Sequence, residues 1–133
     1  MSEPDTVSVE DLRDLHERVV NSPDGAMPGE RDVGALEAAA ARPYSGFGGV
    51  EFYPSPFAKA AALMESIVQR HPFVDGNKRT GLLAAIFSLE LSGYALDAPD
   101  NEQTEVSVET AEHRLDVDGL SRWLQDRAHP SGS

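Results

Sequence analysis

One run of residues constrains the fold of this chain more than any other. Residues 80–91 are apolar on nearly every side of a helix, and Gly93 follows where a helix C-terminus is expected. Such a helix has no face to turn to water, so it belongs in the centre of a bundle. A second apolar stripe, over residues 57–68, follows Ser55 and Pro56, which suit the N-cap and first position of a helix. The sequence therefore predicts a bundle that contains these two helices.

Further helices are predicted on both sides of this pair. Residues 8–11 resemble a capping box and precede apolar residues at three- and four-residue spacing. Residues 33–41 are rich in Ala and Leu up to the stop at Pro43. Residues 97–105 form a polar connection in which a helix can begin, and residues 115–128 carry one apolar face after an aspartate cap. With no alternating strands that would build a sheet, we expect an all-α, compact, single-domain bundle of about six helices.

The length of 133 residues fits one domain, which we expect over residues 7–128. The ends, residues 1–6 and 129–133, are expected to be flexible. Within the domain, residues 43–57 mix Tyr and Phe with many Gly and Pro residues, which predicts a loop with room for a short hairpin. Its aromatic side chains either cap the core or line a docking surface for an extended peptide.

The composition excludes several classes of function. With 23 Asp and Glu against 11 Lys and Arg, the formal net charge is −12, which repels a phosphate backbone and argues against direct nucleic-acid binding. This acidity serves solubility or reflects a salt-adapted or GC-rich source, since Lys59 and Lys78 are the only lysines. No run approaches the ~20 apolar residues of a membrane span, and the acidic start is unlike a signal peptide, so a cytoplasmic protein is expected. The absence of cysteine excludes disulfides and thiolate metal sites.

A polar segment separates the two most apolar helices and carries the candidate chemistry. It reads His-Pro-Phe-Val-Asp-Gly-Asn-Lys-Arg over residues 71–79. Four of its residues stand where a helix N-terminus would hold a phosphate: Gly76, Asn77, Lys78 and Arg79. Asp75 supplies a hard oxygen ligand of the kind that Mg²⁺ prefers, and His71 supplies an imidazole that can accept a hydroxyl proton at neutral pH.

Each of these residues also has an ordinary structural explanation. A histidine at a helix end often caps or packs, an asparagine is a common N-cap, and an arginine is usually a solvated charge. Their combination in a fixed order before a buried helix favours a phosphate site. Phe73, between polar neighbours, is expected to anchor the segment in the core.

The order of these residues resembles the signature of the Fic/Doc superfamily, His-x-Phe-x-Asp/Glu-Gly-Asn, and the resemblance extends over residues 7–128. It implies that His71 deprotonates a hydroxyl of a target protein and that Asp75 binds Mg²⁺. It also implies that nucleotide phosphates are held by three residues, Gly76, Asn77 and Arg79. The loop over residues 44–53 occupies the place of the flap that aligns the target segment in this superfamily.

Two departures distinguish the death-on-curing (Doc) branch within this resemblance. Lys78 replaces a glycine of the adenylyl-transferring proteins, and Leu82 stands where those proteins have a second arginine. Losing that arginine removes one clamp on the polyphosphate, and the lysine obstructs one phosphate subsite while adding a charge to another. The resemblance then implies a reversed ATP with its γ-phosphate at the reacting position. The expected activity is Mg²⁺- and ATP-dependent phosphorylation of a Ser or Thr hydroxyl.

The resemblance also implies partners. No Glu is followed by Gly or Asn, so an inhibitory helix within the chain is not expected, and inhibition would come from an antitoxin whose segment folds on binding. The implied target is the translation elongation factor that delivers aminoacyl-tRNA (elongation factor Tu). Two alternatives remain open: an adenylyltransferase, which Lys78 and Leu82 disfavour, and a catalytically silent antitoxin-binding domain, which the full set of site residues disfavours.

Overall fold

The structure, a computed structural model, describes residues 6–132. Within that range the α-helices are α1 (Val9–Val20), α2 (Val33–Ala41), α3 (Pro56–Arg70), α4 (Asn77–Leu91), α5 (Asp100–Ala111) and α6 (Val117–Arg127), and one 3₁₀ turn spans Arg42–Tyr44. The strands are β1 (Gly46–Phe47), β2 (Val50–Glu51), β3 (Tyr94–Leu96) and β4 (Ala128–Pro130). The expectation of an all-α bundle of about six helices is confirmed.

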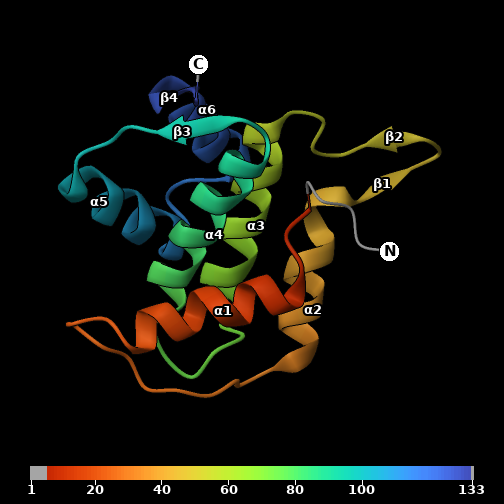
Figure 1. The fold of residues 1–133 in the computed structure, drawn as a ribbon. Helices are drawn as coiled ribbons and strands as arrows, with labels where there is room; N and C mark the ends of the chain where they lie inside the picture. The colour runs from red at the N-terminus through yellow and green to blue at the C-terminus, as the bar shows by residue number, and fades with distance from the viewer. Residues whose placement is uncertain (1–5, 133) are drawn as a thin grey trace.

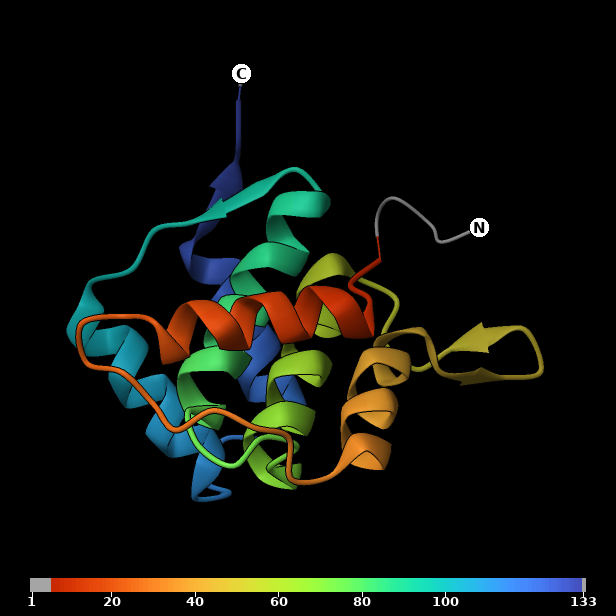
Figure 2. The ribbon, with the colours of Figure 1, turned by 60° about the horizontal axis from the view of Figure 1, so that its bottom comes forward.

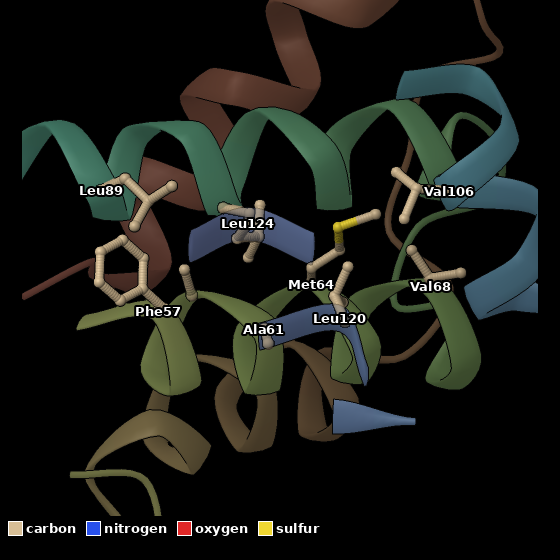
Figure 3. Packing of buried hydrophobic residues seen from close by; sticks show 10 residues of the cluster. Phe57, Ala61, Met64, Val68, Leu89, Val106, Leu120 and Leu124 are labelled. Atoms are coloured by element: carbon tan, nitrogen blue, oxygen red, sulfur yellow. The ribbon is translucent and has the colours of Figure 1, made fainter. Parts of the chain in front are cut away.

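Helix α4 lies in the middle of the molecule, as the sequence predicts, and α3 lies beside it (Figure 1). Their close contact depends on Gly81, because a Cβ atom there would lie 2.7 Å from Cγ2 of Val68. Around this contact, buried side chains from α3, α4, α5 and α6 interlock (Figure 3). This first cluster includes Phe57, Ala61, Met64, Val68, Leu89, Val106, Leu120 and Leu124. Burying each large aliphatic side chain in it contributes about 1.5–3 kcal/mol.

A second cluster forms on the other side of the pair, where α1 and α2 pack (Figure 1). Its large members are Leu12, Leu15, Leu36, Leu63, Ile67 and Phe73. The start of α1 is the capping box that the sequence predicts, with Ser8 and Asp11 exchanging side-chain to backbone hydrogen bonds. Side chains also cap α2, α3 and α6, through Asp32, Ser55 and Asp116. These caps set where each helix begins relative to the core.

The C-terminal end differs from the expectation. His129 and Pro130, which the sequence assigns to a flexible end, belong to β4, and β4 pairs antiparallel with β3. The pairing continues beyond the strands, because the Asp97 N–H donates to the Arg127 carbonyl and the Ser131 N–H to the Gly93 carbonyl. Backbone hydrogen bonds between segments distant in sequence thus order residues that carry no strand pattern of their own. At the N-terminal end, residues 1–6 were expected to be flexible, and of these only Thr6 lies within the described residues.

The aromatic loop contains the short hairpin β1–β2, which projects from the body of the molecule (Figure 1). Phe47 is 83% exposed and Val50 is 68% exposed. The sequence left two explanations for the aromatic residues of this loop, capping of the core and lining of a docking surface. Phe47 does not cap the core. In residues 6–132, no helix is both long and apolar enough to cross a membrane.

Candidate active site

The polar segment between α3 and α4, here the motif loop (residues 71–76), runs beside a second segment, the strap (residues 27–32) (Figure 2). The N–H groups of Arg31 and Asp32 donate to the Pro72 carbonyl, at 2.8 and 3.1 Å. The Val74 N–H donates to the Gly29 carbonyl at 3.0 Å. Backbone hydrogen bonds therefore hold the loop against a segment some 40 residues earlier in the chain.

His71 lies at the C-terminus of α3, where its backbone is left-handed, with φ 52° and ψ 60°. This conformation is uncommon for a residue other than glycine. Its N–H still bonds to the Ile67 carbonyl, and its own carbonyl accepts a hydrogen bond of 2.6 Å from Nε of Arg31. The side chain is exposed, so the imidazole is accessible to a hydroxyl of another protein.

Asp75 presents an exposed carboxylate whose two oxygens each accept one backbone hydrogen bond. Oδ2 accepts from the Met27 N–H at 3.0 Å and Oδ1 from the Gly76 N–H at 2.9 Å. These two bonds, first that from Met27, lower the pKa of Asp75, and the charge of Arg79 adds to the effect. The group is therefore ionised at neutral pH, and each oxygen keeps a lone pair for a cation.

The N-cap of α4 is Gly76, whose backbone is left-handed with φ 77°. A side chain at Gly76 would be crowded, since a Cβ atom would lie 3.0 Å from Cγ1 of Val19. No side chain caps α4, in contrast to α1, α2, α3 and α6. The first N–H groups of α4 and the positive end of its dipole are thus available to an anion.

The two cations of the motif are both exposed at this helix end. Arg79 donates from Nη2 to the Gly25 carbonyl and from Nη1 to Oγ of Ser22 at 3.4 Å, which orients its guanidinium. The side chain of Lys78 makes no hydrogen bond or ion pair with another described residue. A pocket of about 260 Å³ opens beside Arg79 between α1 and α4, and Leu82 lines it. An apolar side chain thus occupies the position where adenylyl-transferring relatives are expected to have their second arginine.

The side chain of Asn77 is buried and turned away from the helix end. Its Nδ2 donates to the Phe73 carbonyl at 2.9 Å, while its Oδ1 accepts from the Phe73 N–H at 3.0 Å. Phe73 itself is 1% exposed and lies in the second cluster. The asparagine thus holds the anchor of the motif loop, and its contribution to phosphate binding would come from its backbone N–H.

Sequence reasoning missed His16 and Arg31. His16 is buried on α1, and its Nε2 lies 2.8 Å from the Asp75 carbonyl. Since a carbonyl only accepts, this nitrogen carries the proton and donates. The signal for His16 was a titratable residue within the apolar stripe of Leu12, Leu15 and Val19. Arg31 lies in turn-rich sequence with no such signal.

The site fits a magnesium–nucleotide complex better than a metal cage built of protein ligands. In the described part of the chain, no three His, Cys, Asp or Glu side chains gather as a metal site. Mg²⁺ often binds through one or two carboxylates together with substrate phosphates. Asp75 beside the uncapped start of α4 offers that donor set.

Comparisons with known proteins agree with this geometry. The sequence model of the Fic/DOC family matches residues 6–89. The Toxin Doc of Mycolicibacterium smegmatis (strain ATCC 700084 / mc(2)155) is 42% identical over 96 residues, which cover 71% of this chain and 74% of the relative. A Fido domain-containing protein of Dictyostelium discoideum is 38% identical over 61 residues, 44% of this chain and 43% of that protein. The chain belongs to the Fic/DOC family.

Proposed function

We propose that this protein is the toxin of a toxin–antitoxin pair and transfers the γ-phosphate of ATP to a Ser or Thr hydroxyl of a target protein. The observation that carries the proposal is the grouping on one short loop of an exposed imidazole, an ionised carboxylate and an uncapped helix N-terminus. His71 is the C-cap of α3, Asp75 accepts a hydrogen bond from the strap, and Gly76 is the N-cap of α4. The name of the Mycolicibacterium relative, Toxin Doc, supports the biological role.

Different residues of the chain have different roles in the proposed phosphoryl transfer. The His71 imidazole takes the proton of the target hydroxyl as its oxygen bonds to the γ-phosphorus. The bond from that phosphorus to the β–γ bridging oxygen breaks, and ADP leaves. The N–H groups at the start of α4, with Lys78 and Arg79, stabilise charge on the phosphate oxygens. Bound Mg²⁺, held through Asp75 and the phosphates, would neutralise further charge.

Lys78 and Leu82 favour phosphoryl over adenylyl transfer. Lys78 extends a full side chain from the exposed start of α4, where a glycine would leave room for a phosphate subsite. Leu82 and Val19 line the adjacent pocket, so a second guanidinium clamp on the polyphosphate is missing at this position. These features support a bound ATP that presents its γ-phosphate to the target.

The exposed hairpin β1–β2 supports a protein target. Phe47 and Val50 stand in solvent on a two-stranded hairpin that has room for an added strand. The hairpin precedes the start of α3 and the motif loop follows its end, so a target that contacts both must span the length of this helix, about 22 Å (Figure 1). The proposed target is elongation factor Tu, so the expected consequence of expression is arrest of translation, and a cognate antitoxin with a segment that folds on binding is the proposed inhibitor.

The test uses purified protein, Mg²⁺, elongation factor Tu and ATP labelled at either the α- or the γ-phosphate. His71→Ala is the loss-of-base variant. His113→Ala is its matched control, because His113 is also exposed at a helix end with a positive φ of 61° and lies outside the motif loop. We expect the target to acquire label from the γ position with wild type and His113→Ala, and not with His71→Ala.

Other outcomes decide between the alternatives. Label from the α position would show adenylyl transfer and overturn the interpretation of Lys78 and Leu82. If the elongation factor stayed unlabelled and translation continued when the protein was expressed, the proposed target would be wrong. Absence of labelled protein in a whole-cell extract would favour a binding-only domain.

A further inference from the structure

The C-terminus of α3 carries an unusual contact on the side of the strap. The exposed guanidinium of Arg31 donates from Nε to the His71 carbonyl and from Nη2 to the Arg70 carbonyl, both at 2.6 Å. The last carbonyls of a helix lack partners within the helix, and a cation there also meets the negative end of the helix dipole. One planar side chain thus satisfies two neighbouring carbonyls.

These carbonyls flank the strained residue of the site. His71 has a positive φ of 52°, a conformation that is unfavourable for a residue other than glycine and persists only where its surroundings hold it. The two hydrogen bonds from Arg31 fix the peptide groups on both sides of the His71 Cα atom. The direction of the imidazole depends on the orientation of these two groups.

Backbone contacts between the strap and the motif loop hold Arg31 in place. Its own N–H donates to the Pro72 carbonyl, so its Cα position is tied to the residue after His71. The preceding residue, Glu30, forms a bridge with Phe73 and is bonded to Arg13 of α1. In the described part of the chain no carboxylate pairs with the Arg31 guanidinium, so its charge serves the two carbonyls alone.

We infer that Arg31 is a positioning residue for the proposed phosphoryl transfer: it holds His71 in the left-handed conformation that directs the imidazole toward the target hydroxyl. The inference rests on the proposed role of His71 as base. Arginine is required because its planar fork donates to two carbonyls at once, whereas a lysine ammonium is a point charge on a flexible stem. Arg31 touches neither nucleotide phosphate nor target in this assignment, so it acts through His71.

The test compares Arg31→Ala and Arg31→Lys with Arg114→Ala. Arg114 is a matched control because it is exposed and likewise makes two guanidinium hydrogen bonds, here to Glu109 outside the motif loop. With γ-labelled ATP, we expect Arg31→Ala to lower kcat by about 10²-fold, as misplacement of a reacting group by ~1 Å does, with little change in KM for ATP or target. Arg31→Lys should lie close to the alanine variant, added ethylguanidinium should restore part of the kcat of Arg31→Ala, and Arg114→Ala should match wild type.

A second measurement, independent of activity, follows the backbone of His71. The Cα chemical shift of His71 reports its φ and ψ angles, and we expect it to move in Arg31→Ala while the shifts of helix α6 stay in place. The inference is overturned if this shift is unchanged, or if Arg31→Ala keeps the wild-type kcat. Different results would overturn the proposed function, namely full activity of His71→Ala or no transfer by wild type. In that case the chemical shift of His71 still tests the role of Arg31.

Discussion

The imidazole ring of His16 lies flat against the phenyl ring of Phe73, with ring centroids 3.9 Å apart and planes 5° from parallel. His16 belongs to α1 and Phe73 to the motif loop, so this stack joins two segments far apart in the sequence. The same imidazole donates to the Asp75 carbonyl. One buried side chain therefore fixes both the anchor of the loop and the backbone of its carboxylate residue.

Two substitutions of His16 separate these contacts. His16→Phe keeps an aromatic ring against Phe73 but loses the donor to Asp75, so we expect a loss of about 1 kcal/mol in the free energy of unfolding. His16→Ala also loses the stack and leaves a cavity, which should raise the loss to about 2–4 kcal/mol. Urea unfolding measures both. Equal losses in the two variants would show that the stack contributes nothing.

Gly81 tests the close contact of α3 and α4. A Cβ atom there would lie 2.7 Å from Cγ2 of Val68 and 3.2 Å from the Met64 carbonyl oxygen, so Gly81→Ala should cost about 1–3 kcal/mol through overpacking. Gly34→Ala is the matched control on α2, where the new Cβ would meet only Oδ1 of Asp32, at 3.3 Å. Since alanine favours a helix over glycine by about 0.5–1 kcal/mol, Gly34→Ala should be no less stable than wild type. Thermal or urea unfolding that found Gly81→Ala as stable as Gly34→Ala would contradict the packing.

The strap is tied to α1 by an ion pair that depends on pH. The Arg13 guanidinium donates two hydrogen bonds to the Glu30 carboxylate, at 2.7 and 3.2 Å, and they lower the pKa of Glu30. A carboxyl group with a lowered folded-state pKa contributes stability above its unfolded pKa, and that contribution is lost as the pH falls through the folded value.

We therefore expect Glu30→Gln to be less stable than wild type at pH 7, by about 0.2–1 kcal/mol as for surface ion pairs. The difference between the two proteins should shrink as the pH falls through the lowered pKa of Glu30. Urea midpoints of both proteins from pH 7 downward measure this. A difference that stayed constant into the acid range would mean that the carboxylate charge of Glu30 does not stabilise the strap.

The exposed side chains of the hairpin β1–β2 should matter for the target and not for folding. Phe47→Ser with Val50→Ser removes apolar groups that are 83% and 68% exposed, so the free energy of unfolding should change by less than about 0.5 kcal/mol. We expect KM for the target protein to rise several-fold while KM for ATP is unchanged.

The matched control for the hairpin is Val33→Ser, because Val33 is 48% exposed and lies at the start of α2, outside the hairpin. It should leave both KM values at the wild-type level. An unchanged KM for the target in the hairpin variant would remove the hairpin from the proposed docking surface.

The sequence alone determined the positions of five helices and the order of the motif residues, whereas α5 (Asp100–Ala111) was readable only as a polar connection in which a helix can begin. Helix caps and helical hydrogen bonds join residues that are about four apart in the chain, so the sequence alone predicts where a helix forms. This holds for the capping box at Ser8, the Ser55-Pro56 start of α3 and the apolar run of α4. The same is true of the motif loop, because His71, Asp75 and the start of α4 lie within one short segment.

Only the tertiary structure decided how that loop is held. Arg31 and His16 reach it from 40 and 59 residues away, through hydrogen bonds to backbone carbonyls. Any residue type offers a carbonyl, so the sequence does not show which residues these two side chains contact. The pairing of β3 with β4 is of the same kind, since one backbone ladder of three residue pairs between distant segments needs no alternation of side chains. Local sequence predicts the helices and the residues of the site. Contacts between segments distant in the chain orient the side chains of that site, and these contacts exist only once the core has packed.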